Sequence, residues 1–352
     1  MDSFSCSRPA VRAIDLFCGA AGLSLGLQRS GIEIVAGVDV DPACRFPFET
    51  NIGARFFEED VADLDGEKIA SMFGDGSVRL LAGCAPCQPF SGYTTKRRDI
   101  DGRWQLLLEF ARLVEESRPE LVTLENVPRL AQLPLWHDFV GRLRNLGYSV
   151  SWDVLDASRY GVPQARRRLV LLGSRLGEIA LPKPLERTIN VREAIGKLPD
   201  VDAGASHERD PLHSSRALTP ANLARIRASK PSGTWRDWPD EMRVKCHTTS
   251  RGRTYPSVYG RMAWEKPSPT ITTQFYGFGN GRFGHPEQDR AITLREGAIL
   301  QSFPEGFEFA PQNRKLNFRE IGRLIGNAVP PALAQAIGQA ILSHVEETRG
   351  AL

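Results

Sequence analysis

The segment GCAPCQPFS, residues 83–91, places a cysteine between two prolines directly after residues 77–82, which are typical of a buried strand. Each proline fixes its own φ angle and lacks a backbone donor, so we expect Cys87 on a stiff, irregular loop. A thiolate is a strong nucleophile, but a free cysteine has a pKa of about 8.5 and needs help to ionise. A lone cysteine is more often small core filler. The residues around Cys87 must therefore decide between the two interpretations.

A carboxyl group and two guanidinium groups follow later strands of the same pattern. Glu125 comes directly after the apolar segment 121–124, and Arg166 and Arg168 alternate onto one face of the extended segment QARRR, residues 164–168. Parallel neighbouring strands end at one edge of a sheet, so Cys87 and Glu125 are expected to face one pocket. A thiol with a carboxyl group and nearby cations indicates covalent catalysis assisted by a general acid.

A glycine-containing turn at residues 15–23, DLFCGAAGL, joins a predicted strand to a predicted helix. Glycine lets a ligand approach the backbone closely, and a helix N-terminus offers free N–H groups. Asp39 lies twenty residues beyond Gly19, at the position where an acidic side chain can hold ribose hydroxyls, and Asp60 ends the next strand. These features predict a cofactor that contains adenosine. The turn lacks the full G-x-G-x-x-G spacing, which makes a dinucleotide the weaker choice.

Alternating segments predict the elements that position these residues. Strand patterns occur at residues 11–17, 32–38, 55–57, 78–82, 121–124, 149–154 and 168–172. Helical patterns occur between several of them, notably at residues 23–29, 104–116 and 135–146. This order predicts an α/β fold with a Rossmann-like, mostly parallel, doubly wound sheet. After about residue 180 only short signals remain, a helix at 222–228 and a strand at 270–273, until a helix at 331–347. We therefore expect a second, smaller and irregular domain.

Composition sets broad limits on the function. The chain has 352 residues, which suggests two domains or one large domain with an insertion. Its 41% hydrophobic and 25% charged residues are typical of a globular protein. No signal peptide and no apolar run of about 18 residues is present, which predicts a cytoplasmic protein, associated with the nucleoid or, in a eukaryote, nuclear. The six cysteines are scattered and do not form a disulfide framework.

The net charge of +3 is too small to indicate nucleic acid by itself. Residues 242–264, however, contain no acidic residue and interleave basic side chains with aromatic ones. The residues concerned are Arg243, Lys245, Arg251, Arg253 and Arg261, with His247, Tyr255 and Tyr259. This stretch suits contacts to phosphates and bases, although a solvated basic surface would have the same composition.

Six motifs in one order carry a resemblance to a known family. They are DLFCG at 15–19, PCQ at 86–88, ENV at 125–127, QARRR at 164–168, LRE through LQSFP at 294–304, and GN at 326–327. Over nearly its whole length the chain resembles the DNA cytosine C5-methyltransferases, which use S-adenosylmethionine and have a class I methyltransferase fold. The resemblance implies the product S-adenosylhomocysteine and no metal. It also implies a catalytic domain at residues 1–184 and 320–352 and a target-recognition domain at 185–319.

The resemblance also assigns residues to roles. The catalytic set is Cys87, Glu125, Arg166 and Arg168. The set expected to bind the cofactor is Phe17, Gly19, Gly22, Asp39, Val40, Asp60, Val61, Leu106 and Asn327. Within it, Asp39 would hold the ribose, Val40 would pack on the adenine, and Asp60 would meet the exocyclic amine. Two residues depart from the family pattern: Ala21 replaces a second glycine, and Ala328 replaces a serine.

The implied reaction transfers a methyl group to carbon 5 of a cytosine that is flipped out of duplex DNA, through a covalent bond between Cys87 and carbon 6. Residues 91–103, with Lys96, Arg97, Arg98 and Arg103, would form a loop that closes over the site. The expected partner is double-stranded DNA, with no membrane. A cognate restriction endonuclease belongs to the expectation if the enzyme serves restriction–modification, whereas an orphan methylase would lack one. We expect a monomer.

Other functions explain fewer of these residues. Cys84 and Cys87 form a CxxC pair, but Gln88-Pro89 interrupts the helix that a thiol–disulfide oxidoreductase needs there. A zinc site would need a second ligand pair, and Cys246 and His247 are adjacent. A DNA-binding protein without enzymatic activity leaves Cys87 and Glu125 without a purpose. A tRNA cytosine C5-methyltransferase shares the chemistry and stays open, although the long variable region at 185–265 favours DNA.

Overall fold

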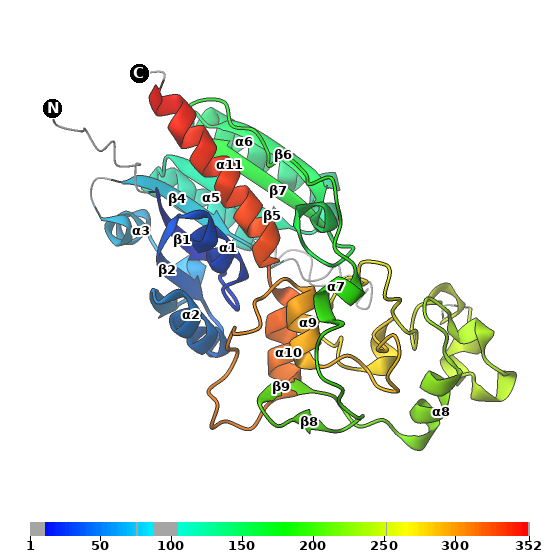
Figure 1. Ribbon diagram of the computed structural model, residues 1–352. Helices are drawn as coiled ribbons and strands as arrows, with labels where there is room; N and C mark the ends of the chain where they lie inside the picture. Colours follow the sequence, from blue (N-terminus) through cyan, green and yellow to red (C-terminus); the bar gives the residue numbers. More distant parts are fainter. Residues whose placement is uncertain (1–10, 75–76, 87–104, 251, 351–352) are drawn as a thin grey trace. The chain divides into compact units, whose positions relative to one another are not determined.

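A computed structural model describes residues 11–74, 77–86, 105–250 and 252–350 (Figure 1). The chain divides into two compact units. Unit 1 comprises Met1–Asp156, Arg167–Pro184 and Val329–Leu352, and unit 2 comprises Ala157–Arg166 and Leu185–Ala328. Unit 2 thus takes residues 157–166 and 320–328, which the sequence analysis assigns to the catalytic domain. The roles of the two domains stay predictions.

Unit 1 is built on a seven-stranded sheet with the order β3-β2-β1-β4-β5-β7-β6. Its strands are β1 (Val11–Leu16), β2 (Glu33–Asp39), β3 (Arg55–Glu58), β4 (Val78–Gly83), β5 (Leu121–Asn126), β6 (Ser149–Asp156) and β7 (Arg167–Ser174). Pairing is parallel from β3 to β5, whereas β7 runs antiparallel to both β5 and β6. The prediction of a mostly parallel, doubly wound sheet is confirmed.

Helices of unit 1 connect successive strands of the sheet, except the last helix, which follows unit 2 in the chain. They are α1 (Gly22–Ser30), α2 (Arg45–Ile52), α3 (Gly66–Phe73), α5 (Gln105–Ser117), α6 (Pro134–Asn145) and α11 (Pro331–Gly350). Short 3-10 helices occur at Pro42–Cys44, Val61–Asp63 and Pro128–Gln132. In Figure 1 the C-terminal helix α11 lies beside α1, while α3, α5 and α6 form a separate group. The alternation of polar and apolar residues in these segments thus gives two helical layers around one sheet.

One hydrophobic core of unit 1 lies between the sheet and α3, α5 and α6. All six residues of β5 are buried, as expected for a central strand covered on both faces. The α5 residues Leu107, Phe110 and Val114 pack with the α6 residues Trp136 and Phe139 in one hydrophobic cluster. This central position makes the ends of β4 and β5 rigid supports for polar side chains.

Unit 2 has little regular structure, as the sequence indicates. It contains α7 (Val191–Ile195), β8 (Ser206–His207), β9 (Asp210–Ser214), α8 (Pro220–Ala228), α9 (Leu294–Leu300) and α10 (Phe318–Asn327). Its 3-10 helices are Ala157–Tyr160, Trp235–Asp237, Asp240–Met242, Lys245–Thr248, Gly252–Thr254 and Phe278–Asn280. The predicted helix at 222–228 is confirmed as part of α8.

The predicted strand at residues 270–273 is wrong. Ile271 is fully buried, but side chains satisfy its backbone in place of a strand partner. Its N–H donates to Gln164 Oε1 at 2.9 Å, and its carbonyl accepts from Arg166 Nη1 at 3.0 Å. Ile271 therefore fills a core without joining a sheet, whereas Thr272 of the same segment is exposed.

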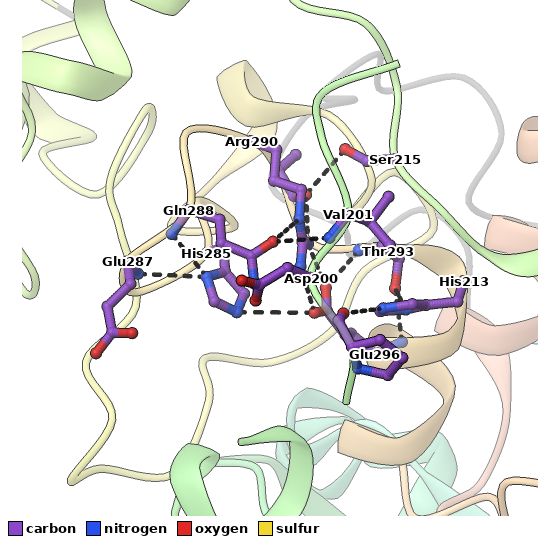
Figure 2. Close-up of polar contacts among 12 residues, drawn as sticks. Asp200, Val201, His213, Ser215, His285, Glu287, Gln288, Arg290, Thr293 and Glu296 are labelled. Carbon is purple, nitrogen blue, oxygen red and sulfur yellow. Dashed lines mark hydrogen bonds and ion pairs between the residues drawn. The ribbon is translucent and has the colours of Figure 1, made fainter. Parts of the chain in front are cut away.

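A buried polar network organises the centre of unit 2 (Figure 2). Arg290 is completely buried and donates two hydrogen bonds to Glu296, at 2.7 and 2.8 Å. Glu296 also closes a capping box with Thr293 at the start of α9. The ring of His285 receives the backbone N–H of Gln288 at 2.9 Å on Nδ1, and its Nε2 lies 3.8 Å from Glu296 Oε1. The LRE motif at 294–296 is therefore used, at least through Glu296, to hold unit 2 together.

The basic stretch at 242–264 contains a structural arginine that the sequence analysis interprets as a nucleic-acid contact. Arg261 is only 5% exposed and donates to the carbonyls of Ile226, Ser229 and His285 at 2.9–3.1 Å. It also pairs with Asp289. For Arg261 the interpretation as a phosphate contact is wrong, because its buried guanidinium already donates to backbone carbonyls and pairs with Asp289.

Aromatic packing explains other members of the same stretch. The His247 ring stacks on Trp235 with 4.4 Å between ring centroids and lies edge-on to Tyr259 at 5.6 Å. His247 is buried, whereas Lys245 and Arg253 are exposed. Only part of the stretch is therefore available to a ligand.

Candidate active site

The segment that leads to Cys87 is tied to both neighbouring strands where it leaves β4. Cys84 donates its backbone N–H to the carbonyl of Leu16, at the end of β1, at 3.3 Å. Asn126, the last residue of β5, donates from Nδ2 to the carbonyl of Ala85 at 3.1 Å. Cys87 itself lies outside the described residues, as do Gln88 and the predicted loop at 91–103. The described backbone thus ends at Pro86, one residue before the proposed nucleophile, and hydrogen bonds to β1 and β5 fix the two residues before it.

Glu125 is the fifth residue of β5 and is 3% exposed. Its Oε2 accepts a hydrogen bond from the Cys84 thiol at 3.0 Å. Its Oε1 lies 2.9 Å from Nε of Arg168, in an ion pair rather than an aligned hydrogen bond. The two oxygens therefore have different neighbours, one a cation and the other a thiol that precedes Cys87 by three residues.

The two predicted catalytic arginines have different surroundings. Arg168 lies in β7 and, with 13% of its side chain exposed, pairs with Glu125 within unit 1. Arg166 belongs to unit 2, is 2% exposed, and donates to the carbonyls of Ile271 and Gly326 at 3.0 and 3.2 Å. Its contacts are those of a structural tie within unit 2, and a catalytic role for it stays a prediction.

The turn after β1 has the strained backbone of a ligand-binding loop. Phe17, Gly19 and Ala21 have φ angles of 59°, 52° and 63°, a region that only glycine adopts without cost. Ala21 is the N-cap of α1, and its own side chain makes no capping bond. A Cβ atom on Gly19 would meet nothing within 4 Å, which leaves the space over the turn open.

Asp39 ties this turn to the end of β2. One carboxylate oxygen accepts the N–H of Gly19 and the other accepts the N–H of Asp41, both at 2.9 Å. A carboxylate oxygen can accept more than one hydrogen bond, including one from a hydroxyl. Val40, next in the chain, is 67% exposed although it is apolar. A carboxylate beside an exposed valine and an open glycine turn fits a ribose with an attached base.

Beneath the turn, Asp15 is fully buried at the end of β1. Its Oδ2 accepts from the Ser24 hydroxyl of α1 at 2.6 Å, so it anchors the first turn of that helix. Burial raises the pKa of Asp15 to about 7, the bonds from Ser24 oppose this, and the nearby charge of Asp39 adds to it.

The remaining residues predicted to bind the cofactor differ in their exposure. Asp60 is exposed and caps the 3-10 helix Val61–Asp63 by accepting the N–H of Ala62 at 3.0 Å. The side chain of Val61 is buried in the core of unit 1, so only its backbone can reach a ligand. Leu106 is half-buried on α5. Asn327 is the exposed last residue of α10, in unit 2.

Comparison with known proteins decides the family. The model of the C-5 cytosine-specific DNA methylase family matches residues 11–343. The chain belongs to this family. The type II methylase M.HgiDII of Herpetosiphon aurantiacus is 45% identical over 339 residues, 95% of each chain. The type II methyltransferase M1.HphI of Haemophilus parahaemolyticus is 32% identical, over 94% of this chain and 86% of that protein.

The fold agrees with this assignment. The crystal structure of a prophage-encoded DNA modification methyltransferase of E. coli superposes with a TM-score of 0.74 at 24% identity, over 95% of this chain and 99% of that one. The Dnmt2 methyltransferase of S. pombe gives a TM-score of 0.59 at 17% identity, over 96% of this chain and 98% of that one. Unit 1 therefore has the class I methyltransferase fold, and the protein is a DNA cytosine-5 methyltransferase. Family membership implies the use of S-adenosylmethionine.

Two groups near the site of the methyltransferase could not be recognised from its sequence. Cys84 attracts notice only as half of a CxxC pair, and its hydrogen bond to Glu125 depends on the register Gly83↔Leu124 between β4 and β5. Asp15 is visible as an acid in the DLFCG motif, but nothing in the motif indicates its burial beneath the turn.

The thiols of Cys18 and Cys44 are poor candidates for a nucleophile. Cys18 and Cys44 are buried, and burial raises the pKa of Cys18 well above its usual range. Among the described residues no cluster of histidine, cysteine, aspartate or glutamate could hold a metal ion. No described helix is long and apolar enough to cross a membrane.

Proposed function

We propose that this methyltransferase methylates carbon 5 of a flipped-out cytosine in a specific sequence of duplex DNA, with Cys87 as the nucleophile and Glu125 as the general acid. The observation that supports this most directly is the buried Glu125 carboxyl group. It is paired with Arg168 at 2.9 Å and bonded to the thiol of Cys84 at 3.0 Å. A buried carboxyl group fixed beside the segment of the proposed nucleophile is what proton transfer to a ring atom requires.

The chemistry assigns a separate task to each group. The Cys87 thiolate adds to carbon 6, the double bond between carbons 5 and 6 breaks, and its electron pair makes carbon 5 nucleophilic. Glu125 donates a proton to ring nitrogen 3 and so neutralises the charge that develops on the ring. S-adenosylmethionine, when bound, supplies an electrophilic methyl group. A base then removes the carbon 5 proton, the double bond forms again, the thiolate leaves, and ring nitrogen 3 returns its proton to Glu125.

Arg168 acts on Glu125 in this scheme. Its guanidinium lies 2.9 Å from Oε1 of Glu125. With Oε1 held by a fixed cation, Oε2 is the oxygen that carries the proton. Its present donor is the Cys84 thiol, a weak donor that a ring nitrogen can displace.

The cofactor would be held by the turn at 17–22 and the ends of β2 and β3. Asp39 would take the ribose hydroxyls, Val40 would pack on the adenine, and Asp60 would accept from the exocyclic amine. Support comes from the open space over Gly19 and from the exposure of Val40 and Asp60. Phe17, Gly22, Val61, Leu106 and Asn327 complete the proposed set. No role is proposed for a metal.

The cellular role follows from the relatives. Two relatives over nearly the whole chain are bacterial type II enzymes. We therefore infer a monomeric, cytoplasmic enzyme of a restriction–modification system, with a cognate endonuclease that recognises the same sequence, or an orphan methylase. Residues 185–319 would choose the sequence.

The covalent step can be tested with a matched pair of cysteine variants. Cys87→Ser should abolish methyl transfer, at least a thousandfold below wild type as is usual for the loss of a nucleophile, and should leave S-adenosylmethionine binding intact. Cys6→Ser is the control, because position 6 lies before the region that the family model matches. Residual turnover of Cys87→Ser within tenfold of wild type would overturn the covalent mechanism.

A trapping experiment separates the two candidate substrates. Duplex DNA that contains 5-fluorocytosine should form an adduct that resists denaturant, because fluorine cannot leave as a proton. The cofactor must be present, and Cys87→Ser should form no adduct. An adduct with tRNA and none with any duplex would transfer the assignment to RNA.

A further inference from the structure

Unit 2 has a concave basic surface formed by segments that are distant in the sequence. Arg216 follows β9, Tyr276 belongs to the long segment before α9, and residues 314–319 lead into α10. Together they line an open pocket of about 460 Å³. Four of its eight lining residues are arginine or lysine and none is acidic, so the pocket attracts an anion.

Three of these cations are available to a ligand. Arg314 donates from both Nη atoms to Glu320 at 2.9 and 3.1 Å, which compensates its charge. Arg216, Lys315 and Arg319 are exposed and have no acidic partner among the residues that line the pocket. The exposed basic groups therefore act as one cluster around the concavity.

The cluster is partly ordered before any ligand binds. The Arg216 guanidinium lies over the ring of Tyr276, 5.7 Å from its centroid, and Tyr276 in turn meets Phe318 edge-on at 5.6 Å. A stacked guanidinium loses less conformational freedom when it binds, and its planar donors match the oxygens of a phosphate group.

Base-edge recognition is a poor match for this pocket. Asn317 is the one amide among the lining residues, and its Oδ1 already accepts the N–H groups of Arg319 and Glu320 to cap α10, at 3.1 and 3.2 Å. A pocket of cations without a free amide acceptor is suited to a sequence-independent contact with the nucleic-acid backbone.

We propose that the pocket of Arg216, Lys315 and Arg319 binds backbone phosphates of duplex DNA. This inference rests on the proposed function and adds the surface by which unit 2 holds the duplex. Arg261, the buried arginine of the basic stretch, cannot serve in this way.

The test compares two triple variants of equal charge. Arg216→Gln/Lys315→Gln/Arg319→Gln removes the pocket, and Lys197→Gln/Arg209→Gln/Lys230→Gln removes three exposed cations elsewhere in unit 2. Binding of a mixed-sequence 30-base-pair duplex is measured by fluorescence anisotropy at several salt concentrations, with S-adenosylhomocysteine present. Removal of one phosphate-binding cation should lower the salt slope by about 0.9. The salt slope of the pocket variant should therefore fall by about 2 to 3, and its affinity for the duplex should fall at least tenfold. The affinity of the control variant should fall less than threefold.

A single substitution tests the opposite direction. Glu320→Gln releases Arg314 and adds one positive charge beside the pocket, so it should tighten DNA binding severalfold and steepen the salt slope by about 0.9. Unchanged binding in Glu320→Gln would count against the pocket even if the triple variant behaved as expected.

Three results would overturn the proposal: an equal loss in both triple variants, a loss confined to tRNA binding, or binding of inorganic phosphate in the pocket without any change in the DNA salt slope. None of them affects the proposed function, which depends on adduct formation by Cys87. Failure of the wild type to bind any duplex would overturn the proposed function itself.

Discussion

At the scale of single residues, Asp15 supports the cofactor turn, and its burial disfavours its ionised form. It is fully buried, bonded to Ser24 at 2.6 Å, and close to the charge of Asp39. Its ordinary pKa is near 4, and burial raises the pKa in the folded protein to about 7. The folded state therefore holds this proton more firmly than the unfolded state does.

The raised pKa of Asp15 in the folded protein sets how the free energy of unfolding changes with pH. The stability from Asp15 is fully present below about pH 4 and is lost as the pH rises through about 7. Asp15→Asn cannot ionise and still offers an oxygen to Ser24, so at pH 8 it should be more stable than wild type, by at most about 4 kcal/mol. The measurement is hydrogen exchange of β1 amides between pH 5.5 and 8.5. The exposed Asp63 gives the control, Asp63→Asn, and equal pH dependence in Asp15→Asn and wild type would contradict the prediction.

Residue types alone predicted part of the site. The placement of Glu125 next to the segment that leads to Cys87 follows from the order of parallel strands, which the alternation of the sequence contains. The separation of Arg166 from Arg168 does not, because two residues that alternate along one segment can belong to different units of the fold. Local spacing does not encode which carbonyls a buried guanidinium will satisfy.

At the scale of elements, the packing of α1 on α11 includes a close approach at Gly26 of α1. A Cβ atom on Gly26 would lie 2.3 Å from Cβ of Ala334 and 2.3 Å from the carbonyl oxygen of Pro331. Real Cβ atoms do not approach other atoms so closely, so the two helices would have to separate. Because α1 also supplies the first turn that contacts Asp15, this separation would reach the cofactor turn.

Gly26→Ala should therefore destabilise unit 1 by about 1–3 kcal/mol, as overpacking does elsewhere, and should weaken cofactor binding. Gly141 in α6 is the matched control, since a Cβ atom there meets nothing within 4 Å. Gly141→Ala should be neutral or stabilise by about 0.5–1 kcal/mol through helix propensity. Urea denaturation followed by circular dichroism measures both variants, and shifts of the same sign would show that the close approach of the helices is not limiting.

The elements themselves were largely predictable in unit 1 and much less so in unit 2. Unit 1 buries the apolar faces of regular helices and strands. The spacing of apolar residues in its sequence therefore indicates both the type of element and its buried face. Unit 2 satisfies its backbone with side chains, as Gln164 and Arg166 do for Ile271, and places the charged pair Arg290–Glu296 in its centre. Such contacts have no sequence period, and a β-branched segment such as 270–273 then suggests a strand that does not form.

At the scale of the whole molecule, each unit holds a buried titratable group, and burial shifts the two pKa values in opposite directions: that of Asp15 upward and that of His285 downward. Burial lowers the pKa of His285 to about 4, an effect that Glu296 opposes and that Arg290 reinforces. A folded-state pKa below the ordinary value near 6.5 means that His285 contributes stability above pH 6.5 and loses it as the pH falls through about 4. Asp15 in unit 1 does the reverse. Acidification from pH 7 to 5 should therefore weaken unit 2 through His285 and strengthen unit 1 around Asp15, where the lowered pKa of the buried His344 in α11 acts in the other direction.

These opposite pH dependences predict that the stabilities of the two units differ more at mildly acidic pH than at neutral pH. Hydrogen exchange at pH 7 and 5, corrected for intrinsic rates, should show falling protection around Ile292 in unit 2 and equal or rising protection in β1 of unit 1. His285→Asn keeps an acceptor for the N–H of Gln288 but cannot take a proton, so it should reduce the acid sensitivity of unit 2 and leave that of unit 1 unchanged. The exposed His137 supplies the control, His137→Asn, which should behave as wild type. A parallel loss of protection in both units would mean that they unfold as one cooperative body, and the charge of His285 would then not be the element that sets the acid limit.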